Sequence, residues 1–199
     1  IDSKLFIKNR ANFSKEMKKN SIAFFNSNDI YPVSADSTLP FEQHRDIFYL
    51  SGIDQEESIL VLCPDNPNPD LREILFLKET NDHIAVWEGP KINKSQALNI
   101  SGIKTVFWLN DLEKVIDSLI SSCENIYINK NEHYRAKIET ETREARFNSW
   151  LENKYSNKNK ERSNPILQRL RSLKDPIEIN LIQQACDITN KGFRRILGF

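Results

Sequence analysis

Apolar and polar positions follow two regimes along the chain, and the change falls near residue 130. From Ser21 to about Lys130, short apolar runs alternate with turn residues, which is typical of strands in a sheet. From about Glu132 onward, apolar residues recur mostly at helical spacing. This order predicts an α/β domain whose carboxyl-terminal part is helical.

The part before residue 130 contains a first helix and a series of strands. The helix, over 4–19, carries Phe6, Phe13 and Met17 on one stripe, with Arg10 between them. Strands are predicted at 21–25, 47–50, 58–62, 74–77, 84–87, 104–108 and 125–128. Three prolines in the segment 64–70 donate no ladder hydrogen bonds, so we expect a loop there. The strands on either side of that loop, 58–62 and 74–77, should form a hairpin.

The stretch from 104 to 128 indicates how the sheet is connected. After the strand at 104–108, Asn110 and Glu113 have the spacing of a capping box at the start of a helix. The apolar stripe of that helix comprises Leu112, Val115, Ile116, Leu119 and Ile120. A strand then returns at 125–128. Strand, helix and strand in this order predict a parallel crossover, and together with the hairpin they predict a mixed sheet.

Further helices are predicted at 140–154 and 166–173, and the last helix has the sharpest start signal in the chain. Asp175 fits the N-cap, Pro176 the first helical position and Glu178 the capping-box site. Its apolar face comprises Ile179, Ile182, Cys186 and Phe193. Because water would otherwise cover this face, we expect the helix to dock on a second copy of the chain or on the sheet domain.

Composition narrows the function classes. The 199 residues include 39% hydrophobic residues, enough for a core, and 28 basic against 28 acidic side chains. A formal charge of zero lacks the field of a dedicated nucleic-acid binder. The apolar runs are too short to cross a bilayer, and Ile1–Lys4 carries charge rather than a signal-peptide core. We therefore expect no nucleic-acid partner, no membrane and a cytoplasmic location.

The cysteines give no metal or disulfide signal. Cys63, Cys123 and Cys186 are odd in number and far apart, without the Cys-x-x-Cys spacing of a metal or redox motif. We expect reduced, buried thiols.

A search for catalytic chemistry yields no complete constellation, so no catalytic and no metal-ligating residue is predicted. None of the three histidines, His44, His83 and His133, has a second histidine at metal spacing. The five isolated glycines cannot build a phosphate loop, and there is no nucleophile elbow. His44 and Asp46 could act together as a general base or metal pair, but a solvated turn is the favoured interpretation.

Acidic residues gather at 139–144, where Glu139, Glu141 and Glu144 are interleaved with Arg143 and Arg146. A solvated helix face with local ion pairs is favoured over a paired-carboxylate active site.

Trp87 is the one candidate binding residue. It ends a predicted strand beside the turn residues Glu88, Gly89 and Pro90, where a large aromatic side chain often contacts a partner. Core packing of an ordinary edge strand is the alternative, and the residues alone favour it. For Trp108 and Trp150 we expect core or helix packing.

Four segments, in order, resemble the amino-terminal domain of aminopeptidase P, the Xaa-Pro aminopeptidases, within the creatinase and prolidase group. The first helix matches through Phe6, Asn9, Arg10, Phe13 and Met17. The segment 39–52 keeps the family's Pro-Phe, Gln, Asp and Tyr-Leu-Ser-Gly positions, while Glu42, His44 and Arg45 depart from it. Residues 87–91 follow the Trp-x-Gly-x-Lys pattern. The last segment matches through Arg171, Lys174, Pro176, Glu178 and Ala185.

The resemblance implies a fold and a domain division. The expected fold is a six-stranded mixed sheet with helices on both faces, similar to ribonuclease H, over residues 1–162. An interdomain linker is expected at 163–175, and residues 176–199 are expected to be the first helix of a truncated pita-bread catalytic domain.

The resemblance also implies a function for the parent protein. An Xaa-Pro aminopeptidase hydrolyses the bond before proline with two divalent metal ions, usually manganese, whose ligands would all lie beyond this chain. The amino-terminal domain would be non-catalytic; it would support a homo-oligomer and shape the access of proline-containing peptides, with Trp87 reaching a neighbouring substrate cleft. Two alternatives stay open: a prolidase, which cleaves Xaa-Pro dipeptides only, or a peptide-binding relative that has lost its metal ligands.

Overall fold

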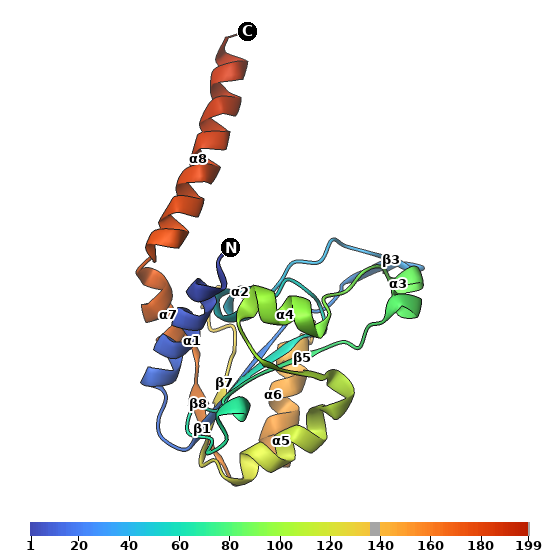
Figure 1. Ribbon diagram of the computed structural model, residues 1–199, viewed down its shortest axis with the longest axis vertical. Coiled ribbons are helices and arrows are strands. Elements are labelled where there is room, and N and C mark those ends of the chain that lie inside the picture. The colour runs from blue at the N-terminus through green and yellow to red at the C-terminus, as the bar shows by residue number, and fades with distance from the viewer. Residues whose placement is uncertain (136–139, 199) are drawn as a thin grey trace.

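A six-stranded sheet organises the chain (Figure 1). The computed structural model describes residues 1–135 and 140–198, apart from the side chains of Asp82 and Trp87. In spatial order the strands are β6 (Thr105–Trp108), β5 (Glu73–Leu77), β4 (Ile59–Leu62), β1 (Ser21–Asn26), β7 (Asn125–Ile128) and β8 (Asn159–Arg162). Neighbours pair in parallel except for β1 with β4 and β4 with β5, which are antiparallel. The predicted mixed six-stranded sheet is confirmed, and so is the hairpin of β4 and β5.

Helices cover both faces of this sheet, as predicted. The α-helices among the described residues are α1 (Ser3–Glu16), α2 (Arg45–Ser51), α3 (Asp82–Glu88), α4 (Lys94–Ser101), α5 (Leu112–Ser121), α6 (Arg143–Lys154), α7 (Asn164–Ser172) and α8 (Pro176–Leu197). Two short 3-10 helices lie at Pro69–Leu71 and Leu109–Asp111, and a separate two-stranded sheet joins β2 (Pro32–Ser34) to β3 (Ser37–Thr38). No helix among the described residues is both long enough and apolar enough to cross a membrane.

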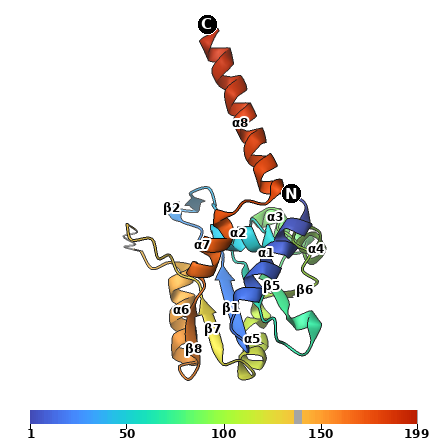
Figure 2. The same ribbon diagram turned by 90° about the vertical axis from the view of Figure 1, so that its left-hand side faces the viewer.

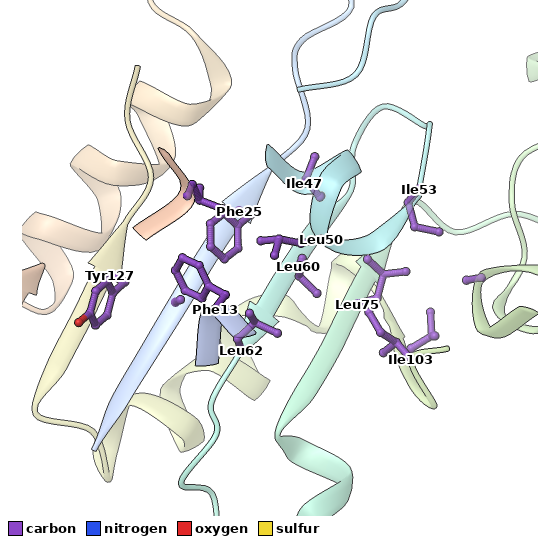
Figure 3. Packing of buried hydrophobic residues seen from close by; sticks show 14 of the residues in the cluster. Phe13, Phe25, Ile47, Leu50, Ile53, Leu60, Leu62, Leu75, Ile103 and Tyr127 are labelled. Atoms are coloured by element: carbon purple, nitrogen blue, oxygen red, sulfur yellow. The ribbon is translucent and has the colours of Figure 1, made fainter. Parts of the chain in front are cut away.

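Two apolar cores follow from the alternation of side chains along the strands. On β1, Ala23 and Phe25 point to the face covered by α1, α2, α4 and α7, whereas Ile22 and Phe24 point to the face covered by α5 and α6. Figure 3 shows the first core, where Phe13 of α1 packs edge-to-face on Phe25 with ring centroids 5.2 Å apart. All six residues of β1 are buried, so this strand is the centre of the domain.

A buried guanidinium ties the first helix to the sheet. Arg10 is fully buried, its Nη1 donates to the Leu50 carbonyl over 2.9 Å, and its Nε donates to Glu73 Oε2 over 2.9 Å. A buried charge needs such partners because desolvation is costly. The predicted stripe of α1 is therefore correct, and Arg10 belongs to it as an anchor between α2 and β5.

Two predicted strands are wrong, because 47–50 lies in α2 and 84–87 lies in α3. Short apolar runs do not distinguish a buried strand from a buried helix turn. The deciding signals are polar residues just before each run: His44 caps α2, and Asn81 caps α3 by accepting from the Ile84 amide. Gly52 then ends α2 in the left-handed conformation, with φ at 70°.

The connection from β6 to β7 is parallel, as predicted, but the two strands are not neighbours in the sheet. Strands β6 and β7 are parallel, but β5, β4 and β1 lie between them in the sheet. The connection through α5 therefore passes these three strands on one face of the sheet. The predicted capping box is also wrong: Asn110 lies within the 3-10 helix, and α5 begins at Leu112 without a side-chain cap. The buried stripe of α5 is confirmed for Ile116, Leu119 and Ile120.

The carboxyl-terminal helices differ sharply in packing. Ile166 and Leu167 of α7 are buried in the first core, so the predicted linker 163–175 contains a packed helix; the division at 162 and 175 stays a prediction. In α8 no residue is buried, and the helix projects away from the sheet in both views (Figures 1 and 2). Of the two predicted docking places for α8, the sheet domain is therefore wrong, and docking on a second copy of the chain stays a prediction. Its predicted capping box of Asp175 and Glu178 is confirmed.

Candidate functional site

A groove of about 1100 Å³ opens where α2, α7 and the first turns of α8 meet the start of α1. Its polar lining includes His44, Arg45, Asp46, Arg171, Lys174 and Glu178. We call this the α2–α7 groove. Segments 44–49 and 171–178, distant in sequence, share its wall, and apolar side chains such as Leu5 and Ile182 complete it.

The wall of the groove is positioned by a braced turn before α2. The side-chain Nε2 of Gln43 donates to the carbonyl oxygens of Ile53 and Gln55 over 3.1 and 2.9 Å. Its Oε1 accepts from the backbone amide of His44 over 2.7 Å. His44 Nδ1 in turn accepts from the Asp46 amide over 3.3 Å, which caps the helix. The turn fixes where the side chains of residues 44 and 46 lie.

Asp46 is the centre of a polar cluster that joins three helices. Its Oδ1 lies 2.5 Å from Arg171 Nη1 of α7, and its Oδ2 accepts from Asn129 Nδ2 over 3.0 Å. The same Asn129 nitrogen donates to Glu144 Oε1 of α6, also over 3.0 Å. The His44 ring lies between the two carboxylates, 3.8 Å from Asp46 and 3.7 Å from Glu144. The four groups beside Asp46 are contributed by segments that are separate in the chain.

The cluster perturbs the pKa values of two of its members. Burial, and then the negative charge of Asp46, raises the pKa of Glu144 to about 7. Burial also lowers the pKa of His44; Asp46 opposes this shift and Arg171 adds to it. The Glu144 carboxyl of this cluster therefore exchanges a proton near neutral pH.

The groove continues to the start of α8, where charged side chains contact one another. Lys8 of α1 lies 2.5 Å from Asp175 Oδ2, and the Asp175 amide donates to Glu178 Oε2 over 2.8 Å. Hydrogen bonding to Lys8, then to the Ile177 amide, lowers the pKa of Asp175. These contacts cap α8 and join its start to α1.

Sequence reasoning misjudged two residues of this cluster. Glu144 was expected on a solvated helix face and His44 in a solvated turn, but both side chains are largely buried and face each other. Glu139, of the same predicted acidic face, lies outside the described residues. Asn129, which is 83 positions from its partner Asp46, carries no local signal that would have identified it. Only tertiary packing brings these residues together.

The tryptophans divide into two groups. Trp108 packs against the first core with Lys94 Nζ 4.6 Å from its ring centroid, and Trp150 packs against the second, as predicted. Trp87 lies in α3, one residue before the end of that helix; its side chain is outside what the structure describes. Its predicted position at a strand end is wrong, and its predicted binding role stays a prediction.

Metal chemistry has no support within residues 1–135 and 140–198. In this part of the chain no three His, Cys, Asp or Glu side chains are grouped so that they could hold a metal ion. The cluster around Asp46 pairs its carboxylate with a guanidinium instead, which suits a structural contact between helices.

The family follows from a comparison with known sequences. The family model of the aminopeptidase P amino-terminal domain matches residues 6–127, more than half of the chain. The chain belongs to this family. The match begins inside α1, takes in the braced turn before α2 and Trp87, and ends inside β7.

Named relatives agree with the family and are much longer than this chain. Human Xaa-Pro aminopeptidase 3 is 26% identical over 170 residues, which are 84% of this chain and 33% of the relative. The Xaa-Pro aminopeptidase of Escherichia coli K12 is 22% identical over 205 residues, which are 99% of this chain and 45% of the relative. The chain thus spans between a third and a half of these relatives.

Solved structures show the same fold. A structure described as a putative aminopeptidase P from Bacillus anthracis superposes with a TM-score of 0.86 at 25% identity, covering 97% of this chain and 46% of that one. A variant of Escherichia coli aminopeptidase P gives a TM-score of 0.77 at 23% identity, and the superposition covers 95% of this chain and 43% of that one. This second likeness is one of fold alone.

Proposed function

We propose that this chain is the non-catalytic amino-terminal domain of a metal-dependent Xaa-Pro aminopeptidase, which removes the amino-terminal residue that precedes proline. The family match over 6–127 carries the proposal. Relatives named Xaa-Pro aminopeptidase, which align with most of this chain, support it.

In this proposal the catalytic groups belong to the part of the parent protein that this chain does not include. The implied pair of divalent metal ions, with manganese as the expected metal, would activate a water molecule for attack on the peptide carbonyl when bound. The described residues do not fit such a pair, because they group no three candidate ligands. We therefore assign no reaction step to any residue of this chain.

The role of α8 in the proposal is to lead into the second domain. Its apolar side chains Ile179, Ile188 and Phe193 are 56%, 71% and 63% exposed, which is unusual for a helix with this pattern. The relatives are more than twice as long as this chain, so their remaining length is available to cover that face. The ion pair of Lys8 with Asp175 would then hold the second domain at a defined angle to the sheet.

The role of α3 in the proposal is contact with a neighbouring subunit and its substrate. Trp87 and the exposed Val86 lie on this short helix, beside the Gly89 turn, and Figure 1 places α3 next to β3 at one extremity of the domain. A helix at such a place can reach another subunit without disturbing the core. A tryptophan ring there would stack on proline or narrow the entrance to peptide amino termini.

The test of the reaction is release of the first residue from Arg-Pro-Pro by the full-length parent protein with added manganese. Release is the expected result. Cleavage of Xaa-Pro dipeptides alone would replace the proposal by a prolidase. Inactivity on both substrates, in a protein shown to be folded and to bind manganese, would favour a peptide-binding relative.

The test of α3 uses two variants in the parent protein, Trp87→Ala and the matched control Val86→Ala. We expect Trp87→Ala to raise KM for longer peptides more than for dipeptides, and Val86→Ala to leave both unchanged. Sedimentation of the same proteins shows whether the parent forms a homo-oligomer. Equal kinetics of all three proteins on both substrates would remove Trp87 from the substrate path.

A further inference from the structure

Two thiols that are far apart in sequence meet at one end of the sheet. Cys63 Sγ, just after β4, lies 3.7 Å from Cys123 Sγ, just after α5, although 60 positions separate them. All three cysteines of the chain are free; Cys63 and Cys123 are buried, as predicted, whereas the prediction of burial is wrong for Cys186 on α8. The proposed function makes no use of this pair.

The two thiols have unequal environments. The pKa of Cys123 is lowered, first by its hydrogen bond with Cys63 and further by Ser122 and the Lys158 ammonium, while burial acts in the opposite direction. Cys123 Sγ also donates to the Leu119 carbonyl over 3.3 Å. Lys158 Nζ is fixed there by donating to the Cys123 carbonyl over 2.5 Å. The hydrogen bond with Cys123, together with burial, raises the pKa of Cys63. Because the Lys158 ammonium lies beside Cys123 and favours its thiolate, Cys123 is the better placed of the two sulfurs to act as the nucleophile.

Both thiols are buried in the second core, but their chain neighbours reach the surface. Asp65, two residues after Cys63, is exposed, and so are Ser122 and Glu124 on either side of Cys123. Cys123 follows the last turn of α5, where helix ends open most easily. A small oxidant therefore needs only a local opening to reach Cys123.

We propose that Cys63 and Cys123 form a peroxide-sensitive dithiol, which oxidises to a disulfide within the folded chain. In the first step the Cys123 thiolate attacks hydrogen peroxide, the O–O bond breaks, hydroxide leaves and a sulfenic acid forms on Cys123. In the second step the Cys63 sulfur attacks the Cys123 sulfur, and the sulfenic oxygen leaves as water with the Cys63 proton. Peroxide is the two-electron oxidant, and both sulfurs are oxidised.

Closing the bond needs a small movement. The sulfur separation must fall from 3.7 Å to about 2 Å, a shift within reach of side-chain rotation and a slight displacement of the end of α5. The product would join the end of β4 to the start of β7 across a 60-residue loop. A cross-link over a loop of this length restricts the unfolded chain, so the oxidised form should melt roughly 5 °C higher.

The experiment uses the Cys186→Ser protein, which lacks the exposed thiol, treated with hydrogen peroxide under native conditions. We expect the intact mass to fall by the mass of two hydrogen atoms. Tryptic digestion should yield a cross-linked fragment that contains both Cys63 and Cys123, and dithiothreitol should reverse the change fully. The matched control adds Cys63→Ser; it should accumulate a sulfenic acid on Cys123 that dimedone traps. The converse variant, Cys123→Ser, should react at least tenfold more slowly.

Three results would overturn the proposal. The first is oxygen addition to Cys123 without a cross-link while Cys63 is present. The second is a disulfide that forms only in urea, which would place the reaction in the unfolded chain. The third is no reaction of the folded protein at peroxide concentrations that oxidise free cysteine.

Discussion

The sheet domain and α8 are two regions of one chain that are stabilised by different means. The domain buries its apolar residues in two cores on either side of β1, and polar side chains such as Arg10 bridge its elements. α8 has an apolar face of similar character, yet none of its 22 residues is buried. Local signals are therefore sufficient to define where a helix begins, whereas burial depends on what the rest of the molecule places beside it.

The largest expected difference between the regions is the effect of removing a phenylalanine ring. Phe25→Ala should lower the free energy of unfolding by about 4 kcal/mol, because the ring is fully buried against Phe13. The matched change in α8, Phe193→Ala, should cost less than about 0.5 kcal/mol, since that ring is 63% exposed. Urea denaturation of both variants measures the contrast. Similar costs would mean that α8 is packed in solution.

Replacing a glycine by alanine should destabilise the sheet domain but stabilise α8. Gly52→Ala should destabilise the protein by roughly 2–3 kcal/mol, because φ is 70° and an added Cβ would overlap the Phe6 ring. Gly192→Ala, in open space within α8, should instead raise helix stability by about 0.5–1 kcal/mol. Thermal melts followed by circular dichroism give both values. A neutral Gly52→Ala would argue against the turn at the end of α2.

The charge cluster makes the stability of the sheet domain depend on pH. The pKa of Glu144 is about 7 in the folded chain against an ordinary 4.5, so the stability it confers is complete below pH 4.5 and is lost as pH rises to 7. Glu144→Gln removes this loss. Between pH 4.5 and pH 8 the free energy of unfolding of the variant, relative to that of the native protein, should therefore rise by on the order of 2 kcal/mol.

The control for this effect is Glu141→Gln, because Glu141 is exposed on the same segment. The free energy of unfolding of the Glu141→Gln variant should follow that of the native protein, with a constant difference, at every pH. Urea denaturation at several pH values provides the data, and a Glu144→Gln profile parallel to the native one would contradict the burial of this carboxyl.

The smallest expected effect concerns the cap of α8. Asp175→Ala removes the acceptor of the Ile177 amide and the ion pair with Lys8, which should cost about 1 kcal/mol. Because α8 has no buried residue, the cost should be confined to that helix, with faster amide exchange in its first turn and an unchanged urea midpoint for the sheet domain. A lower midpoint would show that the two regions unfold together.

Sequence patterns predicted those elements whose signals are local or strictly periodic. Strands β1, β4, β5, β6 and β7 came from apolar runs between turn residues, and the start of α8 came from Asp175, Pro176 and Glu178. The apolar runs at 47–50 and 84–87 were misassigned, because four apolar residues fit a strand as well as one helical turn. The edge strand β8, Asn159–Arg162, has no apolar pattern at all and was not predicted.

The polar cluster could not be predicted in the same way. The spacing of His44 and Asp46 indicates a pair, but Asn129, Glu144 and Arg171 reach them only through the packing of α6 and α7 on the sheet. Whether a carboxylate such as Glu144 is solvated or buried depends on these contacts, which have no counterpart in sequence spacing. In this chain Asp46 forms an ion pair with Arg171 that joins α2 to α7.

Hydrogen–deuterium exchange of the α8 amides, compared between this 199-residue chain and the full-length parent protein, tests the central claim most directly. The claim is that α8 is a locally capped helix whose apolar face becomes covered by the parent's second domain. We predict rapid exchange along α8 in the chain alone and strong protection in the parent, with β1 protected in both. Equal protection of α8 in the two proteins, or rapid exchange in both, would contradict it.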